Sequence, residues 1–422
     1  MESYPTVAPC KKDRETLRML AGRVREIADL PEMETRRRRW REFNALRPER
    51  PMILCFPEGA SLELVPESEL TCEDPFLRRW EWNLRFKLYW WDHLRDDNVL
   101  EPWFDIPWQI SEGDYGVKID YIYGDNCGSY VWDPPLKDLS RDLAKLRFRE
   151  PSVDRGETMR RLSLADEIFG DLLPPRVRGP LWWTVGLTAE AIRLIGLENL
   201  MLYMYDQPEN LHQLMAWLRD EHLHYLTWLE REGLLTLNNE NDYVGSGGVG
   251  YTDELPEKDR APGDPVRLKD LWGFAESQET VGVSPAMFGE FVFEYQLPLL
   301  EKFGLNCYGC CEPVHDRLEY IQRIPNLRRV SVSPWCDQAK MAAWLEGRAI
   351  FSRKPNPSLV CLSFDEEMIR KDIAATLAVA GRCALEIILK DTHTVQNDPS
   401  RLERWVKIAL EEVERFMDGR GI

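Results

Sequence analysis

The carboxyl half of this 422-residue chain alternates between short apolar runs and longer helical patterns. We predict strands at 234–237, 303–308, 327–332, 349–352 and 383–390, and helices that begin near 284, 313, 337, 364 and 400. Strands and helices that alternate at this spacing form parallel sheets with right-handed crossovers. The pattern therefore predicts an α/β fold, and the length suits a single barrel with insertions.

The amino half is less regular. We expect a helical N-terminal extension over 1–50 and a probable inserted β meander over 100–135, because the latter segment is rich in aromatic residues and glycines. Further strands are predicted at 51–56 and 180–184, and helices at 188–195 and 208–232. No linker-like segment interrupts the chain, so residues 1–422 are expected to form one elaborated domain.

Composition excludes several classes of function. The net charge is −18, from 54 basic and 72 acidic residues, which argues against nucleic-acid binding. The basic run 36–39 is interpreted as a solvated helix face. No apolar stretch approaches the length of a membrane span, and the ten cysteines are too few for a disulfide scaffold. With no secretory leader pattern at the start, we expect a cytoplasmic protein.

Two predicted strand exits carry residues that can bind a metal. Cys310 follows the strand at 303–308, and His393 follows the strand at 383–390. Cysteine and histidine are common zinc ligands, and active sites of α/β proteins gather at strand exits. Cys311 and Glu312 remain possible ligands, whereas Cys307 is expected to face the other side of the sheet because it lies an odd number of residues from Cys310.

Several segments, in this order, resemble the uroporphyrinogen decarboxylase superfamily. They are 179–182, 189–196, 206–212, 284–288 and 397–402. The resemblance covers roughly residues 40–418 and implies a (β/α)8 TIM barrel with the active site in its mouth. The decarboxylase branch carries an arginine-rich loop after the first strand, but this chain has Cys55-Phe56-Pro57-Glu58-Gly59-Ala60 there.

The chain looks more similar to the cobamide-dependent methyltransferase branch, whose members bind zinc with a His-x-Cys motif and a late cysteine. The resemblance places the motif cysteine at Cys310, replaces its histidine with Tyr308, and puts His393 at the late cysteine position. We therefore predict zinc bound by Cys310 and His393. Glu240 is the expected third protein ligand, chosen only because of its position in the long loop after 234–237.

Other predicted site residues follow from their positions beside predicted strands. Glu240, Tyr308 and Glu276 are the expected catalytic residues; Glu276 is also a possible metal ligand. Lys354, Asn356, Trp335 and Asn238 are expected to bind substrate at the mouth of the barrel.

The leading hypothesis is a zinc-dependent methyltransferase that moves a methyl group between a small donor, such as a methyl ether, and a corrinoid protein. O-demethylation is one such activity. The sequence contains no Asp-x-His-x-x-Gly corrinoid motif, so the cobalamin must arrive on a separate partner protein. The alternatives are a metal-free decarboxylase-like lyase for a small carboxylated substrate and a non-catalytic barrel that binds a tetrapyrrole. The donor, the acceptor and the direction of transfer stay open.

Overall fold

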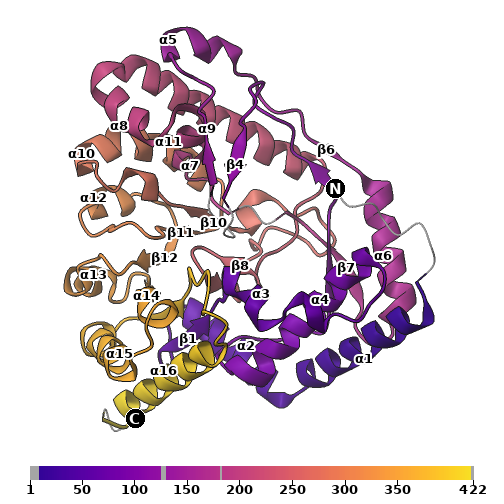
Figure 1. The fold of residues 1–422 in the computed structure, drawn as a ribbon. Coiled ribbons are helices and arrows are strands. Elements are labelled where there is room, and N and C mark those ends of the chain that lie inside the picture. The colour runs from indigo at the N-terminus through magenta and orange to yellow at the C-terminus, as the bar shows by residue number, and fades with distance from the viewer. Residues whose placement is uncertain (1–8, 125–129, 181–182, 420–422) are drawn as a thin grey trace.

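A parallel sheet of six strands forms the centre of the computed structural model, which describes residues 9–124, 130–180 and 183–419. The strand order is β1–β14–β13–β12–β11–β10 (Figure 1). The bounds are β1 (Met52–Cys55), β10 (Trp272–Ala275), β11 (Leu305–Tyr308), β12 (Leu327–Val332), β13 (Ile350–Arg353) and β14 (Leu385–Leu389). The strands predicted at 51–56, 303–308, 327–332, 349–352 and 383–390 are confirmed, each within about two residues of its expected ends.

These strands are buried along most of their length because both of their faces are covered. Every residue of β1, β10, β11, β13 and β14 is buried. Burial on both faces is typical of parallel strands flanked by helices, and it removes the apolar–polar alternation of a half-exposed strand. The α/β class with a parallel sheet is therefore confirmed.

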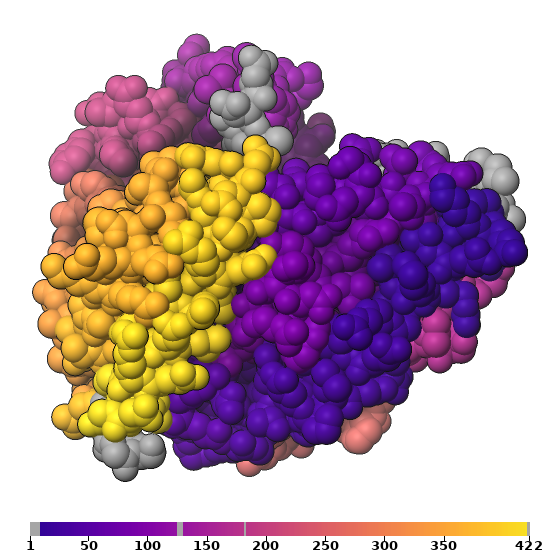
Figure 2. Space-filling view, turned by 60° about the horizontal axis from the view of Figure 1, so that its bottom comes forward, coloured from indigo at the N-terminus to yellow at the C-terminus, as the bar shows by residue number. Residues whose placement is uncertain are grey.

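Helices that follow the strands pack along the outside of the sheet. α13 (Gln338–Leu345) begins after Asp337, whose carboxylate accepts a hydrogen bond from Lys340 N at 2.9 Å. α15 (Glu366–Ala380) packs against α16 (Ser400–Gly419), and α16 also contacts β1. The buried face of α16 includes the predicted apolar stripe through Trp405. In Figure 2, this yellow C-terminal helix lies beside the indigo and purple N-terminal half.

The other helices of the carboxyl half, and those of the segment that precedes it, are mostly short. α10 (Pro285–Phe288) begins as predicted, with the Ser284 side chain as its N-cap and proline at its first position. The helices predicted at 188–195 and 208–232 appear as α7 (Thr188–Ile195) and α9 (Pro208–Arg231). The remaining ones are α8 (Leu197–Asp206), α11 (Glu294–Leu300), α12 (Leu318–Ile321) and α14 (Ser358–Cys361).

The N-terminal extension is helical, as expected, but one part of its basic run is buried. The extension consists of α1 (Lys11–Ala28) and α2 (Pro31–Asn44), and α1 packs against α4 (Pro75–Tyr89). The interpretation of 36–39 as a solvated face is wrong for Arg36, which is 9% exposed. Its guanidinium donates to the backbone carbonyls of Asp96 at 2.6 Å and Asn98 at 2.5 Å. These bonds satisfy two buried acceptors in the segment after α4.

Residues 100–135 form separate strand pairs. β2 (Phe104–Pro107) pairs in parallel with β7 (Pro175–Arg178), and β3 (Ile110–Ser111) pairs with β6 (Ser152–Val153). Only β4 (Tyr121–Tyr123) and β5 (Tyr130–Trp132) form the antiparallel pair expected of a meander. The strand predicted at 180–184 is displaced, because the observed strand is β7; residues 181–182 lie outside the described part of the chain. The other helices of this half are α3 (Ser61–Leu64), α5 (Leu139–Asp142) and α6 (Arg155–Phe169).

The predicted strand at 234–237 is absent, although the segment is in place between its expected neighbours. Gly179 N donates to Thr236 Oγ1 at 2.8 Å on one side. On the other side, the Asn238 amide accepts from Trp272 N at 3.0 Å and donates to Trp272 O at 3.1 Å. Side chains thus replace ladder hydrogen bonds here, so the ladder of strands is interrupted between β7 and β10. Closure into an eight-stranded barrel stays a prediction.

No helix within the described ranges combines the length and apolar character that a membrane crossing requires.

Candidate functional site

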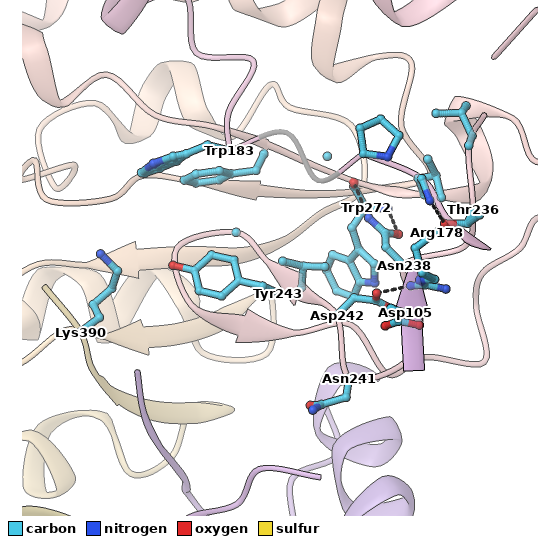
Figure 3. A pocket seen from close by; sticks show the side chains of 18 of the residues that line it. Asp105, Arg178, Trp183, Thr236, Asn238, Asn241, Asp242, Tyr243, Trp272 and Lys390 are labelled. Atoms are coloured by element: carbon cyan, nitrogen blue, oxygen red, sulfur yellow. Dashed lines mark hydrogen bonds and ion pairs between the residues drawn. The ribbon is translucent and has the colours of Figure 1, made fainter. Parts of the chain in front are cut away.

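A cavity of about 660 Å³ opens among the ends of strands and the long loop after α9 (Figure 3). Its walls come from segments far apart in the sequence, including Glu58 after β1, Asp105 in β2, Trp183 after β7, Phe274 in β10 and Lys390 after β14. Such convergence at one place is the usual position of a ligand site in α/β proteins.

The two ends of this cavity differ in character. Trp183, Tyr243 and Lys390 lie towards one end in Figure 3, and Arg178 and Asp242 lie towards the other. Trp183 stacks on Phe274, with ring centroids 5.3 Å apart and planes 7° apart. Arg178 pairs with Asp242, whose pKa is raised by burial even though the arginine lowers it. The cavity is thus aromatic at one end and carries a half-buried ion pair at the other.

The adjacent thiols lie behind the Lys390 end of the cavity. Cys310 Sγ is 3.4 Å from Cys311 Sγ, and Cys311 Sγ is 3.6 Å from Asp391 Oδ2. Asp391 itself lines the cavity. Ser246 Oγ donates to Cys310 Sγ at 3.3 Å from the turn between β8 (Tyr243–Val244) and β9 (Gly248–Val249). Three atoms of types that bind metals, Cys310 Sγ, Cys311 Sγ and Asp391 Oδ2, therefore lie in succession from the buried thiol to the cavity wall.

Gly309 determines which way these thiols point. Its φ of +86° lies in the region that glycine adopts without strain, so the pleat of β11 ends there. As a result, Cys307 and Cys310 belong to the same buried cluster inside the sheet. The expectation that Cys307 faces the other side is therefore wrong, because the alternation of a strand does not continue through a left-handed glycine.

Charged groups surround the thiols. Lys390 Nζ donates to Asp391 Oδ1 at 2.5 Å and lies 3.7 Å from Glu58 Oε1. Burial alone lowers the pKa of Lys390, but the nearby carboxylates of Glu58 and Asp391 raise it, which keeps the ammonium charged. The hydrogen bond with Cys311, together with burial, raises the pKa of the Cys310 thiol well above its ordinary value. In the metal-free protein this thiol is therefore protonated.

Glu312 is a positioning residue for this turn. Its fully buried carboxylate accepts from Cys310 N at 2.9 Å and from Ser277 N at 2.9 Å. It therefore joins the turns that follow β11 and β10, and its oxygens are already occupied by backbone donors. Glu276 is also buried, and burial together with Glu279 and Glu312 raises its pKa well above its ordinary value.

The structure places the other expected catalytic and metal residues apart from this cluster. Tyr308 is fully buried on the helix side of β11, where its hydroxyl donates to Gln296 Oε1 at 2.8 Å. Glu240 forms an ion pair with Arg176 at 2.7 Å. His393 is exposed beside Gly59. Within the described residues, no three His, Cys, Asp or Glu side chains are arranged to hold a metal ion, so the predicted ligands are not assembled.

The expected substrate-binding residues differ in their surroundings. Asn238 lines the main cavity while it bridges to β10. Lys354 is buried inside the sheet, where its ammonium donates to Ser352 Oγ, and burial lowers its pKa to about 8. The Asn356 side chain accepts from Ser358 N at 3.0 Å as a turn contact, and the Trp335 side chain is 66% exposed.

Sequence reasoning missed Lys390, Ser246 and Tyr243 as site residues and left Asp391 out of the ligand set. Lys390 and Asp391 directly follow the strand predicted at 383–390, so the rule that selected His393 could also have selected them. Nothing in the sequence signals Ser246, because its approach to Cys310 depends on a hairpin that folds back over the sheet.

Comparison with known proteins supports the fold. No protein-family model matches the chain, and no curated protein sequence is significantly similar to it. Solved structures do match, among them a methyltransferase from Methanosarcina mazei with a TM-score of 0.50 and 13% sequence identity. The match covers 91% of this chain and 99% of that chain, so the likeness extends over nearly the whole fold.

Proposed function

We propose that this protein is a methyltransferase that moves a methyl group between a small donor and a corrinoid carried by a separate protein. The observation that carries the proposal is the succession of Cys310, Cys311 and Asp391 that ends at the wall of a 660 Å³ cavity. The overall likeness to a methyltransferase supports it. We also propose that the two parallel sheets belong to one elaborated (β/α)8 barrel domain, with the 234–237 segment between them.

The chemistry of the donors fits zinc. Around a tetrahedral zinc with bonds of about 2.0–2.3 Å, neighbouring ligand atoms lie roughly 3.5–3.8 Å apart. The two separations at Cys311, 3.4 Å to Cys310 and 3.6 Å to Asp391, are close to these values. We therefore infer that Cys310, Cys311 and Asp391 would converge on the ion as it binds, because the three are not yet arranged around a metal position in the described residues, and that His393 and Glu240 would need a larger rearrangement to join. Zinc bound there would supply a Lewis acid beside the cavity.

The protein side chains have separable roles in this proposal. Lys390 places a positive charge next to Cys310 and Asp391, which stabilises negative charge that develops at the site. Trp183 and Phe274 form a flat wall that excludes water and orients an apolar donor. Asp391 holds the lysine in place through its Oδ1 atom, while its Oδ2 atom faces Cys311.

Metal content tests the proposal directly. We expect about one zinc per chain in purified protein, lost in Cys310→Ser, Cys311→Ser and Asp391→Asn. Cys383→Ser is the matched control, because this buried thiol donates to Ala342 O at 3.6 Å, away from the cavity. Methyl exchange with cobalamin, followed by visible absorbance, should fall with the zinc content.

Three outcomes would change the assignment. Zinc that survives in Asp391→Asn but disappears in His393→Ala and Glu240→Gln would restore the original ligand set. Metal-free protein with no methyl exchange would refute the methyltransferase. Metal-free protein that releases carbon dioxide from a small carboxylic acid would instead establish the lyase alternative.

A further inference from the structure

A second cavity, of about 250 Å³, lies beside the main one and shares four lining residues with it. The shared residues are Asp105, Asn241, Asp242 and Tyr243. Most of its other walls come from α4, from the turn after it and from the segment before β2, which do not contribute to the thiol cluster; Phe56, Arg176 and Val249 complete the lining. The second cavity is therefore continuous with the proposed active site but built mostly from other segments.

Aromatic side chains enclose this second cavity. They are Phe56, Phe86, Trp90, Trp103 and Tyr243. Phe56 packs edge-on against Trp90 at 5.3 Å and against Tyr243 at 5.1 Å between ring centroids, so these three rings support one another. An apolar cavity of about 150 Å³ is enough for benzene, so this space accommodates one substituted aromatic ring.

Two buried polar atoms on its walls have no hydrogen-bond partner within the described residues: Trp103 Nε1 and Asn241 Oδ1. The Asn241 amide nitrogen is already used, since it donates to Asn98 Oδ1 at 3.0 Å and to Val99 O at 2.6 Å. Figure 3 shows Asn241 apart from the other labelled side chains of the main cavity. Buried polar atoms without partners are rare in native proteins, and here one donor and one acceptor adjoin the same cavity.

Lys87 adds a positive charge to this wall. Its ammonium makes a single long hydrogen bond, 3.5 Å to Trp103 O, and it forms no ion pair with any carboxylate of the described chain. Burial lowers the pKa of Lys87, and the carboxylates of Asp105 and Glu101 in the same cavity wall offset that effect only in part, so a negatively charged ligand atom would further stabilise the ammonium. A lysine and a tryptophan with an unpartnered indole N–H thus both line this aromatic cavity, and the lysine contacts the backbone of the tryptophan.

The geometry points to a binding site for a single aromatic ring that carries an anionic oxygen, a phenolate or a carboxylate. The ring lies between the aromatic walls, and the oxygen binds Lys87 Nζ and Trp103 Nε1. A hydroxyl elsewhere on the ring donates to Asn241 Oδ1. This inference rests on the proposed function in one respect, the identification of the ring compound as the methyl donor. The binding of the ring does not depend on the metal.

Isothermal titration calorimetry with para-methoxybenzoate tests the site. Cyclohexanecarboxylate serves as the probe with the same charge but without an aromatic ring. We expect the aromatic probe to bind the wild-type protein and the saturated probe to bind at least about tenfold more weakly. Lys87→Met should weaken binding of the aromatic probe by about tenfold or more, and Trp103→Phe, which keeps a ring but removes the N–H, by about threefold to tenfold.

Matched controls separate the site from general effects. Lys371→Met and Trp344→Phe change the same residue types outside both cavities and should leave the affinity within about twofold. Cys310→Ser should also bind the probe normally, so loss of zinc and loss of the ring site are distinguishable. Absence of binding in the wild-type protein, which would mean that only water fills the cavity, overturns the inference. Equal affinity in the Lys87 and Trp103 variants overturns it as well.

Discussion

Neutralising Glu386 tests how the sheet interior supports the site. Arg329 and Glu386 are 1% and 0% exposed, and Arg329 Nε lies 2.8 Å from Glu386 Oε1. The second guanidinium nitrogen, Nη2, donates to Asn44 Oδ1 at 2.8 Å. Since a buried charge that loses its partner is left uncompensated, Glu386→Gln should lower the free energy of unfolding by about 3–5 kcal/mol.

The same substitution should disturb the β8–β9 hairpin. A Cβ added to Gly248 would lie only 2.3 Å from Arg329 Cζ, so the guanidinium packs directly under this hairpin. The hairpin supplies Ser246, which donates to Cys310. A displaced Arg329 should therefore reduce zinc retention as well as stability.

Urea unfolding of Glu386→Gln, Arg329→Met and the double variant measures the pair. The double variant should recover much of the loss, because it removes both charges of the pair together. Arg328→Met is a useful comparison, since Arg328 pairs with the more exposed Glu254 and its loss should cost about 1 kcal/mol or less. A loss below about 1 kcal/mol for Glu386→Gln, or additive losses in the double variant, would refute the reasoning.

Three further changes have defined outcomes. Gly248→Ala should cost about 1–3 kcal/mol of stability in thermal unfolding, because Arg329 must move, and an unchanged melting temperature would contradict the close packing. Asn238→Leu should cost a similar amount by breaking both bonds to Trp272, whereas Asn238→Asp, which keeps the acceptor, should cost less in the same measurement. Burial lowers the pKa of His222 to about 4, against about 6.5 when unfolded, so stability should be complete above pH 6.5 and fall by up to about 3 kcal/mol towards pH 4. Urea titrations across this range should show a shallower fall in His222→Gln, and an unchanged slope would rule out this residue as the cause.

The sheet could be predicted because its strands carry their own signal. β1 and β14 are largely apolar runs between turn residues, and their burial on both faces follows from the helices that the same sequence predicts. The segment 234–237 has the same apolar character but makes no regular ladder. It bonds to β10 through the side chain of Asn238 instead of through backbone groups. A pattern of apolar residues cannot indicate that a side chain takes the place of a backbone hydrogen bond.

The site was only partly predictable, for two physical reasons. Strand exits could be located, and they drew attention to Cys310 and to the residues after β14. The direction of each side chain depends on backbone conformation beyond the strand, and at Gly309 a positive φ redirects the thiols. Contacts such as that of Ser246 with Cys310 join residues far apart in the chain, and no local pattern specifies them.

The backbone conformation of Asp391 fits the metal-binding role that we propose for this turn. Asp391 has a φ of +58°, which costs a residue other than glycine about 1 kcal/mol or more. Glu58 holds the turn by accepting from Asp391 N at 2.7 Å, and Lys390 holds the carboxylate. A relaxed, extended residue here would continue the direction of β14 and would not turn its carboxylate towards Cys311. The strain is therefore maintained by two charged contacts whose joint effect is to bring a carboxylate to a thiol at the edge of the cavity.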